Sequence, residues 1–279
     1  MIDPVPLKSG LAMPGLGLGT WRMGEDPGAE RDEIAAIRRA VERGITHIDT
    51  AEMYGEGDCE ALLGRAIQGL ARERLFIVSK VYPWNASAEG MAEACAASLR
   101  RLGTDYLDLY LLHWPGAIAF EQTLEGAAQL KAEGRIRAFG VSNVDASMVA
   151  ALARSGLDDA VEANQVMYNP ARRGIEVDLL PLMAERGIAA VAYTPLEPDR
   201  LRRNRGFVAL AADLGLAPPV LALAWHLTRA QAVPIPKAGR VAHVDALVEA
   251  AGITLTAEVL EEIDRLFPAP TRPQPLDII

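Results

Sequence analysis

Four ionisable side chains follow short apolar runs that are typical of β-strands, and they are Asp49, Tyr54, Lys80 and His113. The runs are ITHIDT (45–50), LFIVSK (75–80) and YLDLYLLH (106–113), and the tyrosine comes shortly after the first of them. In a barrel enzyme, the carboxyl ends of the strands bring side chains from distant parts of the sequence into one site. We therefore expect the four side chains to lie together.

The types of these side chains suit proton transfer. A phenol is a weak acid, with a pKa of about 10 in water, and a neighbouring ammonium group lowers that pKa by stabilising the phenolate. A carboxylate beside the ammonium group would keep it charged and hold it in place. A tyrosine, a lysine and an aspartate at neighbouring strand ends are therefore typical of proton-transfer chemistry.

Each of the four residues, taken alone, also has an ordinary structural explanation. Asp49 could cap the segment that follows it, and Tyr54 could be a loop aromatic whose hydroxyl faces water. Lys80 could be a surface lysine after a strand, and His113 a hydrogen-bonded structural histidine. The functional interpretation is favoured because all four lie at strand ends and inside the motifs described below.

The composition excludes several classes of protein. The chain has 279 residues, 50% of them hydrophobic, and its formal net charge of −9 is unfavourable for binding nucleic-acid phosphates. Its two cysteines, Cys59 and Cys95, form neither a disulfide framework nor a metal-binding spacing. No signal peptide is evident, and no apolar stretch reaches the roughly 18 residues needed to span a membrane. We expect a cytoplasmic protein without a metal site.

Apolar periodicity predicts strands that alternate with helices. After an N-terminal segment that forms a small hairpin and a first strand, predicted strands cover residues 45–50, 75–80, 106–113, 136–143, 160–166, 188–194 and 232–237. Predicted helices cover residues 29–43, 57–71, 87–102, 121–133, 145–154, 174–186, 206–214, 218–229, 241–250 and 256–266. Eight strand–helix units in about 250 residues are typical of a TIM barrel. We predict one α/β domain over residues 1–279, a (β/α)8 TIM barrel with an N-terminal hairpin and extra C-terminal helices.

Gly15, Gly17 and Gly19 invite comparison with the glycine-rich fingerprint of a Rossmann dinucleotide-binding fold. That fingerprint has the spacing G-x-G-x-x-G, and a helix begins directly after it. Here the third glycine comes one residue early, and the segment after it does not begin an obvious helix. We therefore prefer a strand whose glycines allow close packing in the barrel wall.

The segment DTAEMYGEG (49–57) carries a specific resemblance. Together with further motifs in order over nearly the whole chain, it resembles the aldo-keto reductase family, in particular a bacterial branch with short loops that reduces methylglyoxal and similar small aldehydes. The further motifs are GLGTW (17–21), SKVYPWN (79–85), LHWPG (112–116), GVSN (140–143), NQVMYN (164–169), AYTPL (192–196) and IPKA (235–238). The family is a (β/α)8 barrel that uses a nicotinamide cofactor, usually NADPH, which agrees with the predicted architecture.

The resemblance implies a role for each of the four leading residues. Tyr54 would be the general acid that protonates the carbonyl oxygen as hydride reaches the carbon. Lys80, paired with Asp49, would stabilise the phenolate that remains, and His113 would hydrogen-bond and orient the substrate oxygen. The implied reaction is the NADPH-dependent reduction of small aldehydes, ketones or dicarbonyls such as methylglyoxal to alcohols.

The resemblance also implies a set of cofactor-binding residues. They are Gly19, Thr20, Trp21, Asp49, Ser142, Asn143, Gln165, Tyr193, Thr194, Leu196, Lys237, Arg240 and His243. Ser142 and Asn143, after the fifth strand, and Gln165, at the sixth, would hydrogen-bond the nicotinamide carboxamide, with turn and capping chemistry as the structural alternative. Tyr193 would stack on the nicotinamide ring, with a place in the core as its alternative. Thr194 and Leu196 lie where the family contacts the pyrophosphate.

Lys237 matches the family lysine that meets the adenosine 2′-phosphate. The pattern departs from the family here, because Ala238 replaces the usual serine and the expected arginine falls at or near His243. Arg240 is close enough in sequence to take that place. Arginine binds phosphate bidentately, so the displacement bears on nucleotide preference, and we favour NADPH over NADH.

A run of basic residues follows the seventh predicted strand, and it consists of Arg200, Arg202, Arg203 and Arg205. Such a run could form a solvated face of the protein. It could equally bind phosphate, because barrels often bind phosphate near their last two strands. The sequence favours neither interpretation.

Trp21, Trp84 and Trp114 follow predicted strands and could wall an apolar substrate pocket around Tyr54 and His113. The connection after the fourth strand and the C-terminal tail are short, and family members with larger substrates carry long loops at both places. Short loops cannot bury a bulky ligand. We therefore expect a shallow, open pocket for small aldehydes and dicarbonyls.

Two other functions compete with reduction. In an aldolase-like lyase, Lys80 would be a Schiff-base nucleophile, although the carboxylate of Asp49 would hold it charged. In a redox sensor, the barrel would bind cofactor without turnover, although the intact acid, ammonium and carboxylate set argues against this. For the reductase we expect a monomer that acts on small-molecule carbonyl substrates and binds neither nucleic acid nor membrane.

Overall fold

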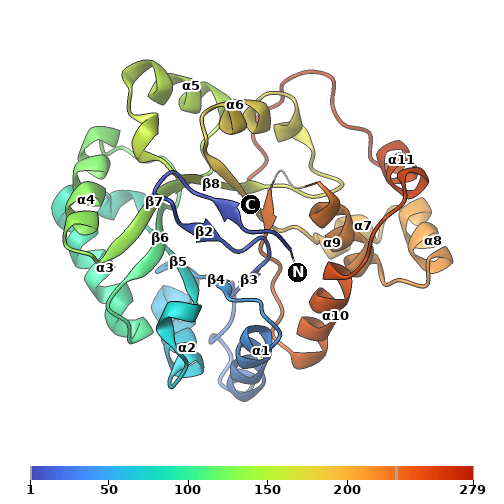
Figure 1. Ribbon diagram of the computed structural model, residues 1–279, viewed down its shortest axis with the longest axis horizontal. Coiled ribbons are helices and arrows are strands. Elements are labelled where there is room, and N and C mark those ends of the chain that lie inside the picture. The colour runs from blue at the N-terminus through green and yellow to red at the C-terminus, as the bar shows by residue number, and fades with distance from the viewer. Residues whose placement is uncertain (1, 230–231, 279) are drawn as a thin grey trace.

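The computed structural model of the protein describes residues 2–229 and 232–278. Its centre is a sheet of eight parallel strands in which each strand lies beside the next one along the chain (Figure 1). The strands are β3 (Gly17–Gly19), β4 (His47–Asp49), β5 (Phe76–Val81), β6 (Leu107–Leu112), β7 (Ile136–Ser142), β8 (Ala163–Met167), β9 (Ala189–Tyr193) and β10 (Val233–Pro234).

The first and last strands of the sheet meet and close it into a barrel. Gly19 pairs with Lys237 in a parallel bridge, and the Gly19 N–H donates to the Pro236 carbonyl at 3.0 Å. A side chain at Gly19 would not fit, because its Cβ would lie 2.8 Å from the carbonyl oxygen of Ile235. The glycines of this strand therefore serve close packing in the wall, and the predicted (β/α)8 architecture is confirmed.

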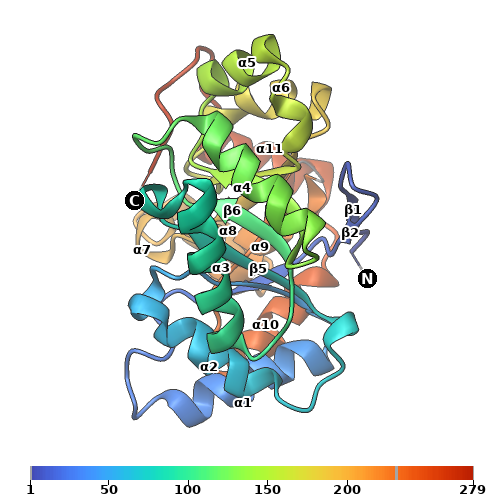
Figure 2. The same ribbon diagram turned by 90° about the vertical axis from the view of Figure 1, so that its left-hand side faces the viewer.

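Helices surround the barrel on all sides (Figures 1 and 2). They are α1 (Glu30–Glu42), α2 (Asp58–Ile67), α3 (Ala88–Leu102), α4 (Phe120–Ala132), α5 (Ala146–Ser155), α6 (Leu179–Glu185), α7 (Pro198–Leu201), α8 (Arg205–Asp213), α9 (Pro218–Thr228), α10 (Val241–Ala251) and α11 (Ala257–Leu266). Short 3₁₀ turns are η1 (Tyr54–Gly57), η2 (Arg72–Arg74), η3 (Pro83–Asn85), η4 (Asp158–Ala160) and η5 (Gly174–Glu176). Among the described residues, no single helix is long and apolar enough to cross a membrane, and only α8 and α9 reach that length and composition, as a pair bent by 86°.

Local signals in the sequence explain where several helices begin and end. The side chain of Ser87 caps α3 by accepting from the Gly90 N–H, and Asp145 caps α5 by accepting from the Met148 N–H. Gly103 ends α3 with a φ of 64°, a left-handed conformation that glycine adopts without strain.

Several elements differ from the prediction, among them the helix predicted over 57–71, which ends at Ile67. Three of the differences have a local explanation. The helix predicted over 174–186 is divided into η5 and α6, because the Asp178 side chain accepts from the Leu179 N–H and begins a new helix there. The strand predicted from residue 160 begins at Ala163, since η4 occupies the preceding residues. The short helix α7 was not predicted, since its four residues are too few to show a periodicity.

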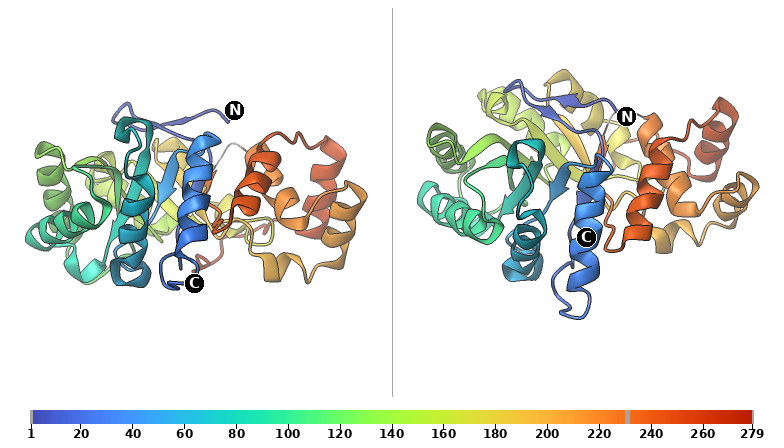
Figure 3. Two further views of the ribbon diagram at one scale, coloured as in Figure 1. Left: turned by 90° about the horizontal axis from the view of Figure 1, so that it is seen from below. Right: turned by 60° about the horizontal axis from the view of Figure 1, so that its bottom comes forward.

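The two ends of the barrel are covered differently. The hairpin of β1 (Val5–Pro6) and β2 (Ala12–Met13) lies across one end, and the N- and C-termini lie on opposite sides of the molecule (Figures 2 and 3). Leu7 and Met13 of this hairpin segment are buried against barrel residues that include Val78 and Leu109. The predicted hairpin therefore closes the amino end of the barrel and leaves the carboxyl end for a site.

The core forms two layers, one inside the barrel and one between the barrel and the helices. In β6, Leu109 and Leu111 point into the barrel, whereas Tyr110 and Leu112 pack toward the helices. Burying one large apolar side chain contributes roughly 1.5–3 kcal/mol, so β6 is held firmly on both faces. Rigid strands in turn fix the positions of the side chains at their carboxyl ends.

Candidate active site

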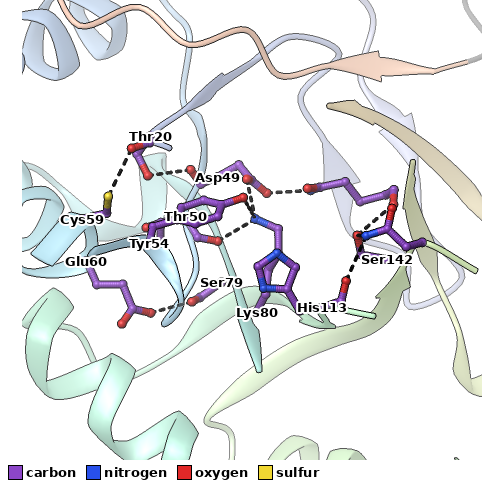
Figure 4. Close-up of polar contacts among 12 residues, drawn as sticks. Thr20, Asp49, Thr50, Tyr54, Cys59, Glu60, Ser79, Lys80, His113 and Ser142 are labelled. Atoms are coloured by element: carbon purple, nitrogen blue, oxygen red, sulfur yellow. Dashed lines mark hydrogen bonds and ion pairs between the residues drawn. The ribbon is translucent and has the colours of Figure 1, made fainter. Parts of the chain in front are cut away.

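The four leading residues of the sequence analysis lie together at the carboxyl end of the barrel (Figure 4). Asp49 is the last residue of β4, Lys80 lies near the end of β5, and His113 directly follows β6. Tyr54 begins η1, the short turn after β4. Neighbouring parallel strands thus deliver all four side chains to one rim, as predicted.

Lys80 is at the centre of this group. Its Nζ lies 2.6 Å from Asp49 Oδ1, 2.8 Å from the carbonyl oxygen of Thr50 and 2.9 Å from the hydroxyl oxygen of Tyr54. An ammonium group has three protons to donate, so these contacts use all of them. The side chains of Lys80 and Asp49 are only 0% and 1% exposed, so water weakens their attraction little.

The surroundings of Lys80 keep it protonated. Burial alone would lower the pKa of its ammonium group, but the charge of Asp49 and the contact with Tyr54 outweigh burial and raise the pKa above its usual value. A Schiff-base nucleophile needs a lysine that can lose its proton. The environment of Lys80 is therefore unsuited to the competing lyase chemistry.

The pKa of Tyr54 differs from what its ammonium neighbour alone would produce. Burial is the largest effect and raises the pKa of the phenol, and the charge of Asp49 raises it further, so the pKa lies above its usual value although Lys80 lowers it. The phenol therefore carries its proton at neutral pH. The sequence indicated the lowering by an ammonium group but not the larger opposite effect of burial, which depends on the packing around the ring.

His113 is neutral. Burial, together with the charge of Lys80, lowers the pKa of its imidazole to about 3. The ring meets Tyr54 edge-on with centroids 5.8 Å apart, and its Nδ1 has no hydrogen-bond partner in the part of the chain that the structure describes. A neutral imidazole beside a phenol can hydrogen-bond a bound oxygen without adding a charge.

A second polar group lies beside the first, at the ends of β7, β8 and β9. Ser142 Oγ donates to the Gln165 carbonyl at 2.9 Å, and the Tyr193 hydroxyl donates to Asn143 Oδ1 at 2.9 Å. Gln165 joins the two groups, because its Nε2 donates to Asp49 Oδ2 at 2.7 Å. Each oxygen of the Asp49 carboxylate is thus held by a different strand.

Both polar groups border one cavity of about 460 Å³. An apolar cavity with a few convergent polar groups is the usual form of a small-molecule site. The predicted site residues that line it are Gly19, Trp21, Asp49, Tyr54, His113, Ser142, Asn143, Gln165, Tyr193, Thr194, Leu196 and Lys237.

Three predicted cofactor residues lie outside this lining. Thr20 is buried behind it, where its hydroxyl donates to the Asp49 carbonyl at 3.0 Å and steadies the end of β4. Arg240 and His243 are exposed where α10 begins, shortly after Lys237. Thr20 therefore supports the wall, while the two basic residues lie beyond the cavity.

Two of the three tryptophans predicted to wall the pocket also lie outside the cavity lining. Trp84 stacks on Tyr82 with ring centroids 4.2 Å apart and is 63% exposed. Trp114 lies next to His113, with the two rings 4.9 Å apart. Of the three tryptophans, Trp21 alone is among the described residues that line the cavity, and contact of Trp114 with a ligand stays a prediction.

The arginine run after β9 lies outside the cavity as well. Arg200 borders a separate hollow beside the C-terminal tail, and Arg202 pairs with Asp199 at 3.3 Å. All four arginines of the run are exposed. These positions favour the solvated face over the phosphate site.

Comparison with known proteins identifies the family. Residues 15–267 match the Aldo/keto reductase family. The chain belongs to this family. The resemblance of the motifs is thereby confirmed, and this aldo/keto reductase is an oxidoreductase.

Individual relatives cover the whole chain. Methylglyoxal reductase YeaE of Escherichia coli (strain K12) is 41% identical over 280 residues, which cover 99% of this aldo/keto reductase and 98% of the relative. An NADH-specific methylglyoxal reductase of the same organism is 31% identical over 314 residues, with coverage of 90% and 95%. The crystal structure of an aldo/keto reductase from Klebsiella pneumoniae in complex with NADP and acetate has a TM-score of 0.94, 42% identity and full coverage of both chains.

Some cavity residues of this aldo/keto reductase were missed by sequence reasoning. Met53 and Glu197 line the cavity beside predicted residues, and so do the apolar residues Pro219 and Ile235. Met53 directly precedes Tyr54, and Glu197 directly follows Leu196. Their positions beside predicted site residues could have placed both at the cavity. Pro219 is the second residue of α9, far from any motif, and its place at the cavity follows only from the fold.

Proposed function

We propose that this aldo/keto reductase uses NADPH to reduce small aldehydes, ketones or dicarbonyls such as methylglyoxal to alcohols. The observation that carries the proposal is the contact of Lys80 Nζ with both Asp49 Oδ1, at 2.6 Å, and the Tyr54 hydroxyl, at 2.9 Å. This arrangement opens on a cavity large enough for a small ligand. Cytoplasmic localisation and a monomeric state stay predictions.

The second polar group supports the proposal that the cavity binds a nicotinamide. Ser142, Asn143 and Gln165 offer hydroxyl and amide groups, which match the donors and acceptors of a carboxamide. Tyr193 lines the same cavity. The bound cofactor supplies the hydride that reduces a carbonyl carbon, and the relative from Klebsiella is itself a complex with NADP.

Basic residues at the edge of the cavity and just beyond it support binding of the phosphorylated form of the cofactor. Lys237 and Arg240 bring two positive charges to an otherwise acidic protein with a net charge of −9, and His243 lies beside them. A 2′-phosphate would be attracted by this group. One methylglyoxal reductase relative is NADH-specific, so the choice of nucleotide needs the direct test below.

The chain's own residues would handle the proton of the reaction. Tyr54 would donate its phenolic proton to the carbonyl oxygen, so that one hydride and one proton together convert a carbonyl group to an alcohol. The negative charge left on the phenol would lie 2.9 Å from Lys80 Nζ, where it is stabilised. The neutral imidazole of His113 would hydrogen-bond the same oxygen and orient it for the transfer.

The shape of the site supports small substrates. The chain between β6 and α4 is short, and Trp21 at the cavity wall is 43% exposed. A ligand in such an open site is only partly covered, so a bulky molecule would gain little from binding there. The match to methylglyoxal reductase YeaE supports the same substrate class.

Purified protein mixed with NADPH and methylglyoxal, or another small aldehyde, is expected to consume NADPH. The loss of nicotinamide absorbance measures this consumption. We expect a lower KM for NADPH than for NADH, because only NADPH carries the 2′-phosphate. Absence of turnover across a panel of aldehydes, ketones and dicarbonyls would refute the proposed function.

The variant Lys237→Met tests the nucleotide preference within the same assay. It should raise the KM for NADPH about tenfold, as expected for losing a charge-assisted phosphate contact, while changing the KM for NADH about twofold or less. Equal effects on both nucleotides would show that Lys237 does not meet the 2′-phosphate.

The pH dependence of reduction tests the neutral state of His113. Because its imidazole pKa is lowered to about 3, kcat/KM should show no limb from this residue between about pH 5 and 8. His113→Ala should lower kcat/KM about 10²- to 10³-fold by removing a hydrogen bond to the reacting oxygen, without altering the profile. An acidic limb at about pH 6.5 that disappears in the variant would contradict a neutral histidine.

A further inference from the structure

The loop after β9 forms one wall of the cavity and has an unfavourable backbone conformation. Thr194 and Glu197, at its two ends, have φ angles of 50° and 25°, and both line the cavity. Positive φ is rare for residues other than glycine, and especially for a β-branched residue such as threonine. Each such residue costs of order 1–3 kcal/mol and persists only when its surroundings hold it in place.

Asn169 and Arg172, both on the segment after β8, hold this loop. Asn169 is fully buried, and its Nδ2 donates to the Thr194 carbonyl at 3.1 Å and to Glu197 Oε2 at 2.9 Å. The Arg172 guanidinium donates to both carboxylate oxygens of Glu197, from Nε at 3.2 Å and from a terminal nitrogen at 3.1 Å. A forked contact of this kind fixes the direction of the carboxylate as well as its position.

The C-terminal tail also contacts Arg172, through Asp277. Asp277 Oδ1 accepts from the remaining terminal nitrogen of Arg172 at 2.7 Å. This contact joins residues that lie 105 positions apart in the sequence. One guanidinium group therefore ties the tail to the cavity loop.

The charge of Glu197 makes this tie relevant to cofactor binding. Its carboxylate lies in the wall beside Thr194 and Leu196, where the proposed cofactor would place its pyrophosphate. An unpaired carboxylate there would repel the phosphates. Arg172 places a positive charge against Glu197 and shares it with Asp277. The side chains of Arg172 and Glu197 are 26% and 19% exposed, so screening by water is incomplete.

We propose that Arg172 is a positioning residue for cofactor binding, which holds the loop of residues 194–197 ready for the cofactor through Glu197 and couples the C-terminal tail to that loop through Asp277. The inference rests on the proposed binding of NADPH. It assigns a role to a residue that lies outside the cavity and outside the motifs of the sequence analysis.

Arg172→Met removes the ion pairs with Glu197 and Asp277 and leaves the Glu197 carboxylate without a counter-ion. We expect a dissociation constant for NADPH raised about five- to fiftyfold, mainly through faster dissociation, which is less than for a fully buried pair because both partners are partly exposed. Binding is measured by titration of NADPH fluorescence, and dissociation by stopped-flow displacement with NADP. The increase should shrink as salt is added, because salt screens the repulsion between Glu197 and the phosphates.

Two further variants separate this role from general loosening of the fold. In the double variant Arg172→Met with Glu197→Gln, the repelling charge is gone, and part of the lost affinity should return. Asp277→Asn should speed NADPH dissociation only about two- to threefold, because Arg172 still holds Glu197. Arg265→Met is the matched control, since Arg265 pairs with Glu262 on the exposed face of α11.

The outcomes are distinct. NADPH affinity of Arg172→Met equal to that of Arg265→Met would overturn the inference, and so would a double variant that binds no better than Arg172→Met. Thermal unfolding without cofactor checks that each variant is folded. Failure of the unmodified protein to bind NADPH would instead refute the proposed function.

Discussion

Tyr54→Phe is expected to lower the turnover of small aldehydes about 10²- to 10⁴-fold, the range found for removal of a general acid. The change deletes only the hydroxyl group. The ring keeps its edge-on contact with His113 and its place 4.6 Å from Lys80 Nζ, so the cavity keeps its shape. NADPH binding should therefore stay within about threefold of that of the unmodified protein.

Steady-state turnover and NADPH fluorescence titration on the same preparation check this expectation. Tyr106→Phe is the matched control, because Tyr106 lies at the opposite end of β6, where its ring packs against the guanidinium of Arg72 at 3.9 Å. That variant should keep full turnover. If Tyr54→Phe kept it as well, Tyr54 would not be the acid, and if the unmodified protein bound NADPH without turnover, the redox-sensor hypothesis would gain support.

The barrel and the grouping of Asp49, Lys80 and His113 were predictable because both depend on local patterns. Buried strands show as continuous apolar runs, and a parallel barrel brings the residues after those runs to one rim. Asp49, Lys80 and His113 could therefore be placed together from their positions at strand ends. The strand of Gly17 and Gly19 was also predictable, since its spacing did not fit the alternative fingerprint.

Properties that depend on the distance between remote segments were not predictable. The sequence indicated that an ammonium group would lie near Tyr54 and lower its pKa. The larger effect of burial, which raises that pKa, arises from packing. Trp84 follows a strand as predicted, yet it stacks on Tyr82 and is not among the residues that line the cavity. The contact of Arg172 with Asp277 joins the middle of the chain to its tail, and no motif marks it.

Lys80→Met is expected to remove activity and stability together. Turnover should fall because the phenolate of Tyr54 loses the charge that stabilises it, an effect of about 10²-fold or more for a group of this kind. Stability should fall because Asp49, with a side chain 1% exposed, is left as a buried charge without its counter-ion. Removing one partner of a buried pair costs about 3–5 kcal/mol, which urea denaturation would measure.

The double variant Lys80→Met with Asp49→Asn separates the two effects. Asparagine removes the buried charge and can still bind Gln165, whose Nε2 lies 2.7 Å from Asp49 Oδ2, so most of the lost stability should return. Turnover should not return, because the phenol still lacks its ammonium neighbour. Since Lys80 lowers the pKa of Tyr54 in the unmodified enzyme, the alkaline limb of carbonyl reduction, where the phenol loses the proton it must donate, should also move to higher pH in both variants. Recovery of turnover in the double variant would mean that Lys80 serves only to neutralise Asp49.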